Sequence, residues 1–312
     1  MIFGIDGGGT RSRLQIRTVP SGDLLSSVEG GCTNLYALEY EHVEQNLLDL
    51  IREGCAQAGI DPTSLQSGCI GSAGLDRIDE KAKFAEICKH ILPTDCELTL
   101  CNDGEILLVG ASGSLKGYCL IAGTGSFALG RDLLGTTVRA GGLGYMLGDE
   151  GSAVWITMQA LNRSLRSIEG RDLNTRLMKA LLEYFKLISP SDFIRLTHYH
   201  FNKANFAAFS PIVTKYAAEG DELANDILEK AVQELVALVE SVHQRLKLAA
   251  PILVLSGGVL EHDKIIQPLF RQLLNKRLPD VQIIKPIGNA VEGACMIAMQ
   301  KLIDKRKGWA AK

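Results

Sequence analysis

Hydrophobic positions along the first half of the chain predict short strands alternating with longer helices. Apolar residues recur at helical spacing between 41 and 58, where Val43, Leu47 and Ile51 share one face and Gly59 stops the pattern. The other predicted helix covers 79–92. Strands are predicted at 1–5, 14–19 and 24–28, near Cys69-Ile70, and at 97–101.

The second half repeats this order. Strands are predicted at 118–122, 127–131, 136–139, 252–255 and 281–284, and helices at 152–165 and 221–246, with shorter helices to about residue 210, one helix before 281 and a closing helix after Gly288. Each half opens with three strands around a glycine turn and then alternates helix with strand. The pattern therefore predicts a duplicated α/β unit.

Length and charge narrow the range of functions. A chain of 312 residues suits two domains, and its net charge of -3 gives no electrostatic reason to expect a nucleic-acid or acidic-membrane partner. The longest apolar stretch, Leu248–Leu260, is interrupted and shorter than the roughly 20 residues that a bilayer requires. The first residues lack the basic segment of a secretion signal. We therefore expect a cytoplasmic protein.

The 8 cysteines carry no recognisable metal pattern. They stand at 32, 55, 69, 88, 96, 101, 119 and 295, without a CxxC pair or a Cys/His spacing that suits zinc. We expect buried free thiols in a reducing compartment.

Two glycine turns are candidates for binding phosphate. The first is Asp6-Gly7-Gly8-Gly9-Thr10, and the second is Gly123-Thr124-Gly125-Ser126 at the matching place in the other half. Glycines let a backbone approach phosphate oxygens closely, and the Asp6 carboxylate suits magnesium, held directly or through water. Neither turn has the P-loop lysine, and the first is not a dinucleotide fingerprint. The alternative for each is an ordinary tight hairpin.

Two further segments hold carboxylates that are candidates for catalysis or for ligand binding. Asp103 follows the strand 97–101, at the end where open α/β sheets bind ligands, so it could accept a proton from an attacking hydroxyl. The alternative is that Asp103 caps a helix. Glu105 is expected to be a solvated residue of the first turn. The segment 141–152 is rich in glycine and holds Asp149, a candidate acceptor for ligand hydroxyls. Its alternative is a solvent loop with acidic capping residues before a helix that Ser152 could cap.

The motifs together resemble a known family. DGGGTRS, NDG, IAGTGS, GGxGxxxGDEGS and SGG occur in the order and spacing of the N-acetylglucosamine kinase branch of the BadF/BadG/BcrA/BcrD ATPase family. That family belongs to the sugar kinase, actin and heat-shock-chaperone superfamily. The resemblance implies an α/β fold of two ribonuclease-H-like, actin-like ATPase domains with an interdomain cleft. It places the first domain at 1–112, with a C-terminal helix at about 289–305 packing back on it, and the second at 113–312, with a helical insertion at about 152–247.

The resemblance also implies roles for individual residues. The ATP-binding set is Asp6, Gly8, Gly9, Thr10, Gly123, Thr124, Gly125, Ala207, Gly257 and Gly258, with Asp6 near Mg2+. Asp103 is the implied catalytic base for a sugar 6-hydroxyl. The substrate-binding set is Asn34, Asp103, Ser126, Gly142, Leu143 and Asp149. The family also implies a homodimer.

One residue departs from the family pattern. Leu143 stands where these acetylglucosamine kinases carry a tryptophan that packs on the sugar. The resemblance predicts an ATP-dependent kinase of an amino sugar, with N-acetylglucosamine as the first candidate substrate. Because Leu143 replaces the tryptophan, glucosamine, N-acetylmuramic acid and plain glucose are also candidates. The alternatives are an ATPase that activates a partner enzyme, as the acyl-CoA dehydratase activators do, and a sugar-sensing protein without catalysis.

Overall fold

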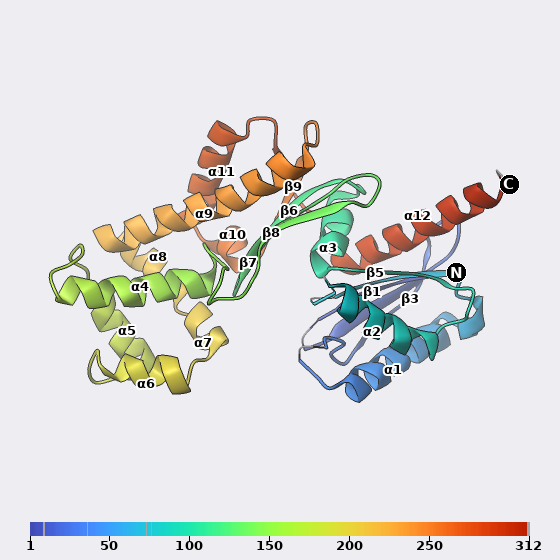
Figure 1. Cartoon of the computed structure of the whole chain (residues 1–312), viewed down its shortest axis with the longest axis horizontal. Coiled ribbons are helices and arrows are strands. Elements are labelled where there is room, and N and C mark those ends of the chain that lie inside the picture. Colours follow the sequence, from blue (N-terminus) through green and yellow to red (C-terminus); the bar gives the residue numbers. More distant parts are fainter. Residues whose placement is uncertain (9, 36, 73, 76, 311–312) are drawn as a thin grey trace. The chain divides into compact units, whose positions relative to one another are not determined.

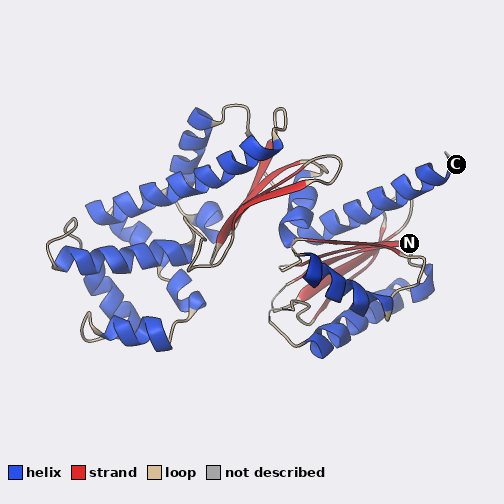
Figure 2. Cartoon of the chain, in the orientation of Figure 1, coloured by secondary structure: helices blue, strands red, loops and turns tan. Residues whose placement is uncertain are grey.

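The computed structural model describes residues 1–8, 10–35, 37–72, 74–75 and 77–310. The chain divides into two compact units (Figures 1 and 2). Unit 1 comprises residues 1–117, 133–135 and 285–312, and unit 2 comprises 118–132 and 136–284.

Unit 1 is built on a five-stranded sheet in the order β3-β2-β1-β4-β5. Its elements are β1 (Ile2–Gly7), β2 (Ser12–Arg17), β3 (Leu24–Gly30), α1 (Tyr40–Ala58), the 3-10 turn η1 (Pro62–Ser64), β4 (Ser67–Ser72), α2 (Ile78–Lys89), β5 (Glu97–Cys101), α3 (Asp103–Ser112) and α12 (Ala290–Ala310). Strand β1 pairs antiparallel with β2 and parallel with β4.

Helices cover both faces of this sheet. Phe3 and Ile5 pack with the buried side chains of α1 and α2, whereas Ile2 on the opposite face packs with α3 and α12. The C-terminal helix α12 lies beside α3 although nearly 180 residues separate them in the sequence (Figure 1). The last helix of the chain therefore completes the first unit.

Unit 2 repeats the strand order around a larger helical layer. Its sheet order is β10-β9-β6-β7-β8, so in both sheets the first strand lies between the second and the fourth. The elements are β6 (Gly117–Ala122), β7 (Ser126–Arg131), β8 (Thr137–Gly141), α4 (Ala153–Ile168), α5 (Leu177–Phe185), α6 (Asp192–Tyr199), α7 (Lys203–Ala207), α8 (Ser210–Ala218), α9 (Glu222–Leu246), β9 (Ile252–Ser256), α10 (Gly258–His262), α11 (Ile266–Arg277) and β10 (Gln282–Ile284). The predicted duplication is confirmed.

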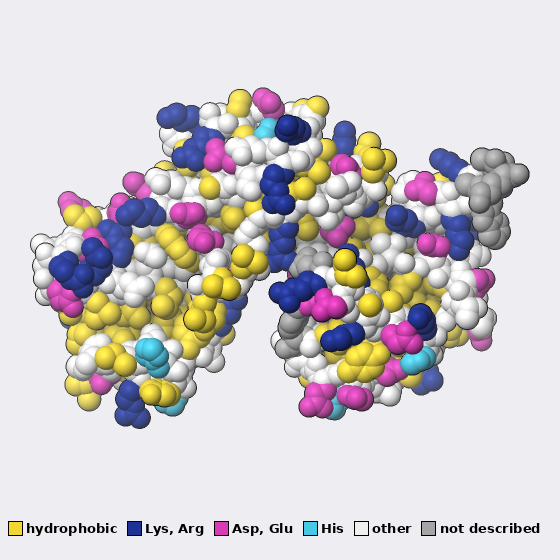
Figure 3. Space-filling model, in the orientation of Figure 1, with side chains coloured by type: hydrophobic (Ala, Val, Ile, Leu, Met, Phe, Trp, Pro, Cys, Tyr) yellow, Lys and Arg dark blue, Asp and Glu magenta, His cyan; other side chains and the backbone are white. Residues whose placement is uncertain are grey.

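The helical segment α4–α9 carries the main core of unit 2. Helix α9 lies against β7 and β8, and its buried residues join one large cluster with α4 and α8. Arg163 on α4 binds Asp172 and Asp226, so it ties α4 to the following loop and to α9. Several apolar side chains of this segment are exposed, among them Ile188, Ile194 and Tyr199. Figure 3 shows hydrophobic surface, in yellow, over this part of unit 2.

The sequence patterns located most elements but erred at two helices. Helix α2 ends at Lys89 rather than at Leu92, because the N–H groups of His90 and Ile91 bond to carbonyl groups three residues back, those of Ile87 and Cys88, as in a tight turn. Helix α3 was not indicated by periodicity, because it is apolar and buried around most of its circumference. Ser152 caps α4 as predicted, accepting the Trp155 N–H.

We predict that a methyl group at Gly110 separates α3 from α12. A Cβ atom there would stand 1.8 Å from the Asn289 carbonyl oxygen, so Gly110→Ala should destabilise unit 1 by about 1–3 kcal/mol. Thermal unfolding followed by circular dichroism measures this change. Gly258→Ala is the matched control, since no atom lies closer than 4.0 Å to its added methyl group. Equal stability of both variants would contradict the prediction.

Candidate functional site

The parallel strands of unit 1 bring two predicted acidic residues to one edge of the sheet. Asp6 on β1 aligns with Gly71 on β4, and Gly71 aligns with Cys101 at the end of β5. Asp103 follows Cys101 by two residues. Asp6 and Asp103 therefore both lie at the carboxyl edge of this sheet, where open α/β folds bind ligands.

Asp103 is the first residue of α3, and its neighbours perform the capping. The Asn102 side chain accepts the Gly104 N–H at 2.8 Å, and the Glu105 carboxylate accepts the Asn102 N–H at 3.3 Å. The alternative in which Asp103 caps the helix is wrong, and so is the expectation that Glu105 is solvated, because Glu105 is buried. The Asp103 carboxylate accepts the Gly104 N–H at 2.9 Å and is half-buried.

Asp6 occupies a drier position than an ordinary surface carboxylate. Burial raises the pKa of its carboxyl group, and the nearby charge of Arg13 lowers that pKa by a smaller amount. The adjoining Gly7 is closely surrounded, since a Cβ there would stand 2.6 Å from the Thr33 hydroxyl. Such a carboxylate gains from a cation that replaces its lost water.

The first glycine turn is closed by its own backbone. The Gly8 N–H donates to the Arg11 carbonyl at 3.1 Å, so it holds the turn instead of pointing at a ligand. Thr10 is exposed, and Gly9 lies outside the described residues. Asn34 is half-buried in the loop after β3, where its carbonyl accepts the N–H groups of Ala37 and Leu38.

Unit 2 contains a cavity of about 750 Å³ that four predicted nucleotide-binding residues line. They are Gly123, Thr124, Ala207 and Gly258, joined by other residues of α7, α8 and α10. The volume suits a ligand of several hundred daltons, and the lining is mostly apolar with polar side chains such as Thr214 and Asp263.

The turn Ser256-Gly257-Gly258 lies against the second glycine turn. Gly257 has φ 98°, and a Cβ there would stand 2.4 Å from the Ala122 carbonyl oxygen, so only glycine fits. Its N–H donates to the Glu261 carboxylate at 2.8 Å. In the neighbouring turn, the Gly123 N–H donates to the Gly125 carbonyl at 3.0 Å.

A smaller cavity of about 290 Å³ adjoins the same turn. Gly123 and Thr124 line both cavities. The predicted sugar-binding residues Ser126, Gly142 and Asp149 also line the smaller one. Leu143 is 70% exposed and is not among its lining residues. The structure therefore groups three of the predicted sugar-binding residues, and places Leu143 outside the group.

Asp149 is held tightly within this smaller cavity. It is buried, its φ is +59°, and its carboxylate stands where a Cβ on Gly125 would approach to 2.7 Å. Lys203 donates to the same carboxylate at 3.3 Å. The alternative of a solvent-facing acidic loop is therefore wrong for Asp149. Ser126 donates its hydroxyl hydrogen to the Glu150 carbonyl at 2.6 Å.

Sequence reasoning missed two cationic residues of this cavity. Lys203 and Arg139 both line it. Arg139 stacks on the Phe127 ring at 4.5 Å and donates to the carbonyl oxygens of Gly141 and Gly142. Lys203 lies in a segment without a recognisable motif, so nothing local marks it.

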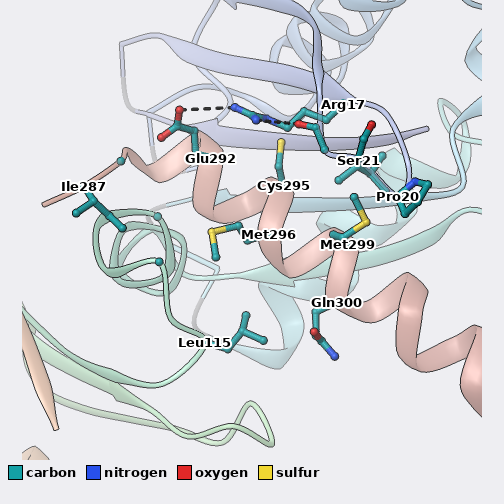
Figure 4. Close-up of a pocket in the computed structure, with 15 residues that line it drawn as sticks. Arg17, Pro20, Ser21, Leu115, Ile287, Glu292, Cys295, Met296, Met299 and Gln300 are labelled. Carbon is teal, nitrogen blue, oxygen red and sulfur yellow. Dashed lines mark hydrogen bonds and ion pairs between the residues drawn. The ribbon is translucent and has the colours of Figure 1, made fainter.

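A separate cavity of about 510 Å³ lies in unit 1, away from the predicted residues (Figure 4). Ile2, at the opposite end of β1 from Asp6, lines it, and Arg17 and Glu292 face each other across 3.6 Å there. Figure 4 shows Cys295, Met296 and Met299 from α12 along one side.

The described residues contain no group of three or more His, Cys, Asp or Glu side chains that could hold a metal ion by itself. The half-buried Asp6 carboxylate nevertheless fits magnesium, because this ion takes one or two protein carboxylates and completes its shell with water and phosphate oxygens. No described helix has the length and apolar character needed to cross a membrane.

The whole chain was compared with known proteins. The model of the BadF/BadG/BcrA/BcrD ATPase family matches residues 3–298. The chain belongs to this family. It is 32% identical over 300 residues to an N-acetylmuramic acid/N-acetylglucosamine kinase of Clostridium acetobutylicum, covering 95% of this chain and 97% of the relative. It is also 27% identical to an N-acetyl-D-glucosamine kinase of Dictyostelium discoideum, covering 96% and 98%.

Solved structures agree on the fold. A candidate N-acetylglucosamine kinase from Chromobacterium violaceum matches with a TM-score of 0.69 at 25% identity, covering 95% of this chain and 98% of that one. A ROK hexokinase from Thermus thermophilus matches with a TM-score of 0.59 at 16% identity, covering 96% and 99%. The predicted α/β, actin-like fold of the family is confirmed.

We predict that Asp6→Asn stabilises the protein at neutral pH. A raised pKa means that folding disfavours the carboxylate, so the isosteric amide removes that penalty. The gain should shrink as pH falls through the Asp6 pKa, because the wild-type carboxyl group then becomes neutral. Denaturant unfolding at several pH values measures it. Asp61→Asn should act oppositely, because hydrogen bonds from Thr63 lower the pKa of Asp61. A less stable Asp6→Asn variant at pH 7 would refute the assignment.

Proposed function

We propose that this protein is an ATP-dependent kinase that transfers the γ-phosphoryl group of ATP to the 6-hydroxyl of an amino sugar, N-acetylglucosamine first. The observation that carries the proposal is the turn Gly123–Thr124, which lines both the larger cavity and the smaller one. A phosphate held there would have a nucleotide pocket on one side and a polar pocket on the other. The family and its amino-sugar kinase members support the same reaction.

In this proposal Asp103 accepts the proton of the sugar 6-hydroxyl as that oxygen attacks the γ-phosphorus. Its position as the first residue of α3 holds the carboxylate at the sheet edge, while Asn102 and Glu105 carry the helix cap. Asn34, Ser126, Gly142 and Asp149 are proposed to bind the sugar. Asp6 would hold Mg2+ through water, and Mg2+ would neutralise charge on the phosphates.

We propose nucleotide-binding residues in each of the two units. In unit 2, Ala207, Gly257 and Gly258 would line the adenosine, and Gly123, Thr124 and Gly125 would face the phosphates. In unit 1, Gly8, Gly9 and Thr10 would form the other phosphate turn. These assignments rest on the family resemblance and, in unit 2, on four of the residues, Gly123, Thr124, Ala207 and Gly258, which line the larger cavity.

The activator alternative is not favoured. Such an ATPase needs accessible cysteines to hold an iron–sulfur cluster, and none of the 8 cysteines, all of which lie among the described residues, is exposed. Burial also raises the pKa of Cys88 to about 12 and that of Cys96 to about 11, so neither is a ready thiolate ligand. The homodimer, the cytoplasmic location and the lack of a nucleic-acid or membrane partner stay predictions.

The deciding experiment is a coupled ADP-release assay with ATP and Mg2+. It compares glucose, glucosamine, N-acetylglucosamine, N-acetylmannosamine and N-acetylmuramic acid. We expect strong ADP release with an amino sugar and little without one. Hydrolysis at one steady rate regardless of sugar would refute the kinase and favour the activator.

We predict that Asp103→Asn lowers kcat by about 100- to 10,000-fold, because it removes the proton acceptor. Fold and ATP affinity should persist, since Asn102 and Glu105 cap the helix without Asp103. Steady-state kinetics and thermal unfolding measure the two effects. Asp79→Asn, in the first turn of α2, is the matched control and should keep wild-type turnover. A near-normal rate for Asp103→Asn would remove Asp103 from the role of base.

A further inference from the structure

The smaller cavity of unit 2 carries an excess of positive charge. Its charged lining residues are Arg139, Lys203 and Asp149, which gives two positive charges and one negative charge, a net of +1. Hydroxyl and acetamido groups of a neutral sugar are satisfied by neutral donors and acceptors or by a carboxylate. A neutral sugar therefore does not account for the additional positive charge of this cavity.

Lys203 is the residue that supplies this excess. Arg139 is held on the Phe127 ring and on two backbone carbonyl groups, so it supports the loop. Lys203 lies 3.3 Å from the Asp149 carboxylate, and its side chain is still 43% exposed. An ammonium group has three N–H donors, and the contact with Asp149 engages one of them.

The position of Lys203 distinguishes a sugar from a nucleotide. Lys203 begins the short helix α7, after Asn202, whose side chain accepts the Asn205 N–H. Ala204 and Ala207 of the same helix line the larger cavity, whereas Lys203 lines only the smaller of these two. The lysine thus lies on the proposed sugar side and contacts Asp149, a proposed sugar-binding residue.

We propose that Lys203 is a specificity-determining residue that binds a carboxylate carried by the amino sugar, while Asp149 binds its hydroxyl groups. This inference rests on the proposed kinase function. A lactyl ether on the sugar O3 supplies such a carboxylate and leaves the 6-hydroxyl free to react. Leu143 is 70% exposed and does not line the cavity, so the side chain at this position takes up none of the space that such a substituent needs. A charge-assisted hydrogen bond then pairs ammonium and carboxylate.

The test compares two sugars that differ by this substituent. For Lys203→Met we expect the KM for N-acetylmuramic acid to rise about 10- to 100-fold, the usual effect of losing a hydrogen bond between charged groups. The KM values for N-acetylglucosamine and ATP should stay within about twofold of wild type, and Lys203→Arg should restore most of the affinity for the acidic sugar. Lys179→Met, on the exposed face of α5, is the matched control.

Other outcomes separate this inference from the proposed function. Equal losses with both sugars would make Lys203 a support for Asp149 and would overturn the inference. A higher KM for ATP would assign the lysine to phosphate and would overturn it too. If the wild-type protein phosphorylates N-acetylglucosamine and ignores N-acetylmuramic acid, the inference fails and the kinase stands. If no sugar stimulates ADP release, both fail.

Discussion

Parallel pairing of the first strand with the fourth is the constraint on which both units depend. In unit 1 it aligns Asp6 with Gly71, and the next parallel pair aligns Gly71 with Cys101, so acidic residues distant in sequence lie at one edge of the sheet. In unit 2 the same pairing aligns Ile121 of β6 with Ser256 of β9. The glycine turns that follow these two strands therefore lie together, and the cavities form around them.

Close backbone approach is the second requirement, and glycine supplies it at specific places. Gly110 and Gly293 allow α3 and α12 to touch, since a Cβ on either would stand less than 2 Å from a carbonyl oxygen of the other helix or its start. This contact fixes the helix that begins with Asp103. In unit 2, the absence of a side chain on Gly125 leaves the space that the Asp149 carboxylate occupies. Close packing of the backbone thus sets where these carboxylates stand.

Much of the fold could be predicted from the sequence, and each wrong prediction has a physical reason. Strands such as 97–101 and the helix after Ser152 follow local periodicity and capping, which act over a few residues. Helix α3 was not predicted, because it is buried on nearly all sides and its sequence therefore lacks the amphipathic pattern of a surface helix. The role of Glu105 was misjudged because its partner is a backbone N–H that only the folded turn presents.

Part of the candidate site could be predicted and part could not. Motifs pointed to Ser126, Gly142 and Asp149, which the fold places around one cavity. Lys203 joins them from 54 residues beyond Asp149, through the packing of α7, and no spacing rule connects the two. Leu143 belongs to the most distinctive motif, yet its side chain is largely exposed. A motif fixes the path of the backbone more firmly than it fixes which side chains face a ligand.

The internal hydrogen bonds of the two glycine turns bear on the thermodynamics of association. Gly8 and Gly123 each donate an N–H within their own turn, so these two hydrogen bonds are in place before any ligand arrives. Glycine-rich segments ordinarily lose much conformational entropy when they become ordered. Under the proposed function that loss would belong to folding rather than to phosphate binding, so more of the intrinsic interaction energy would be expressed as affinity.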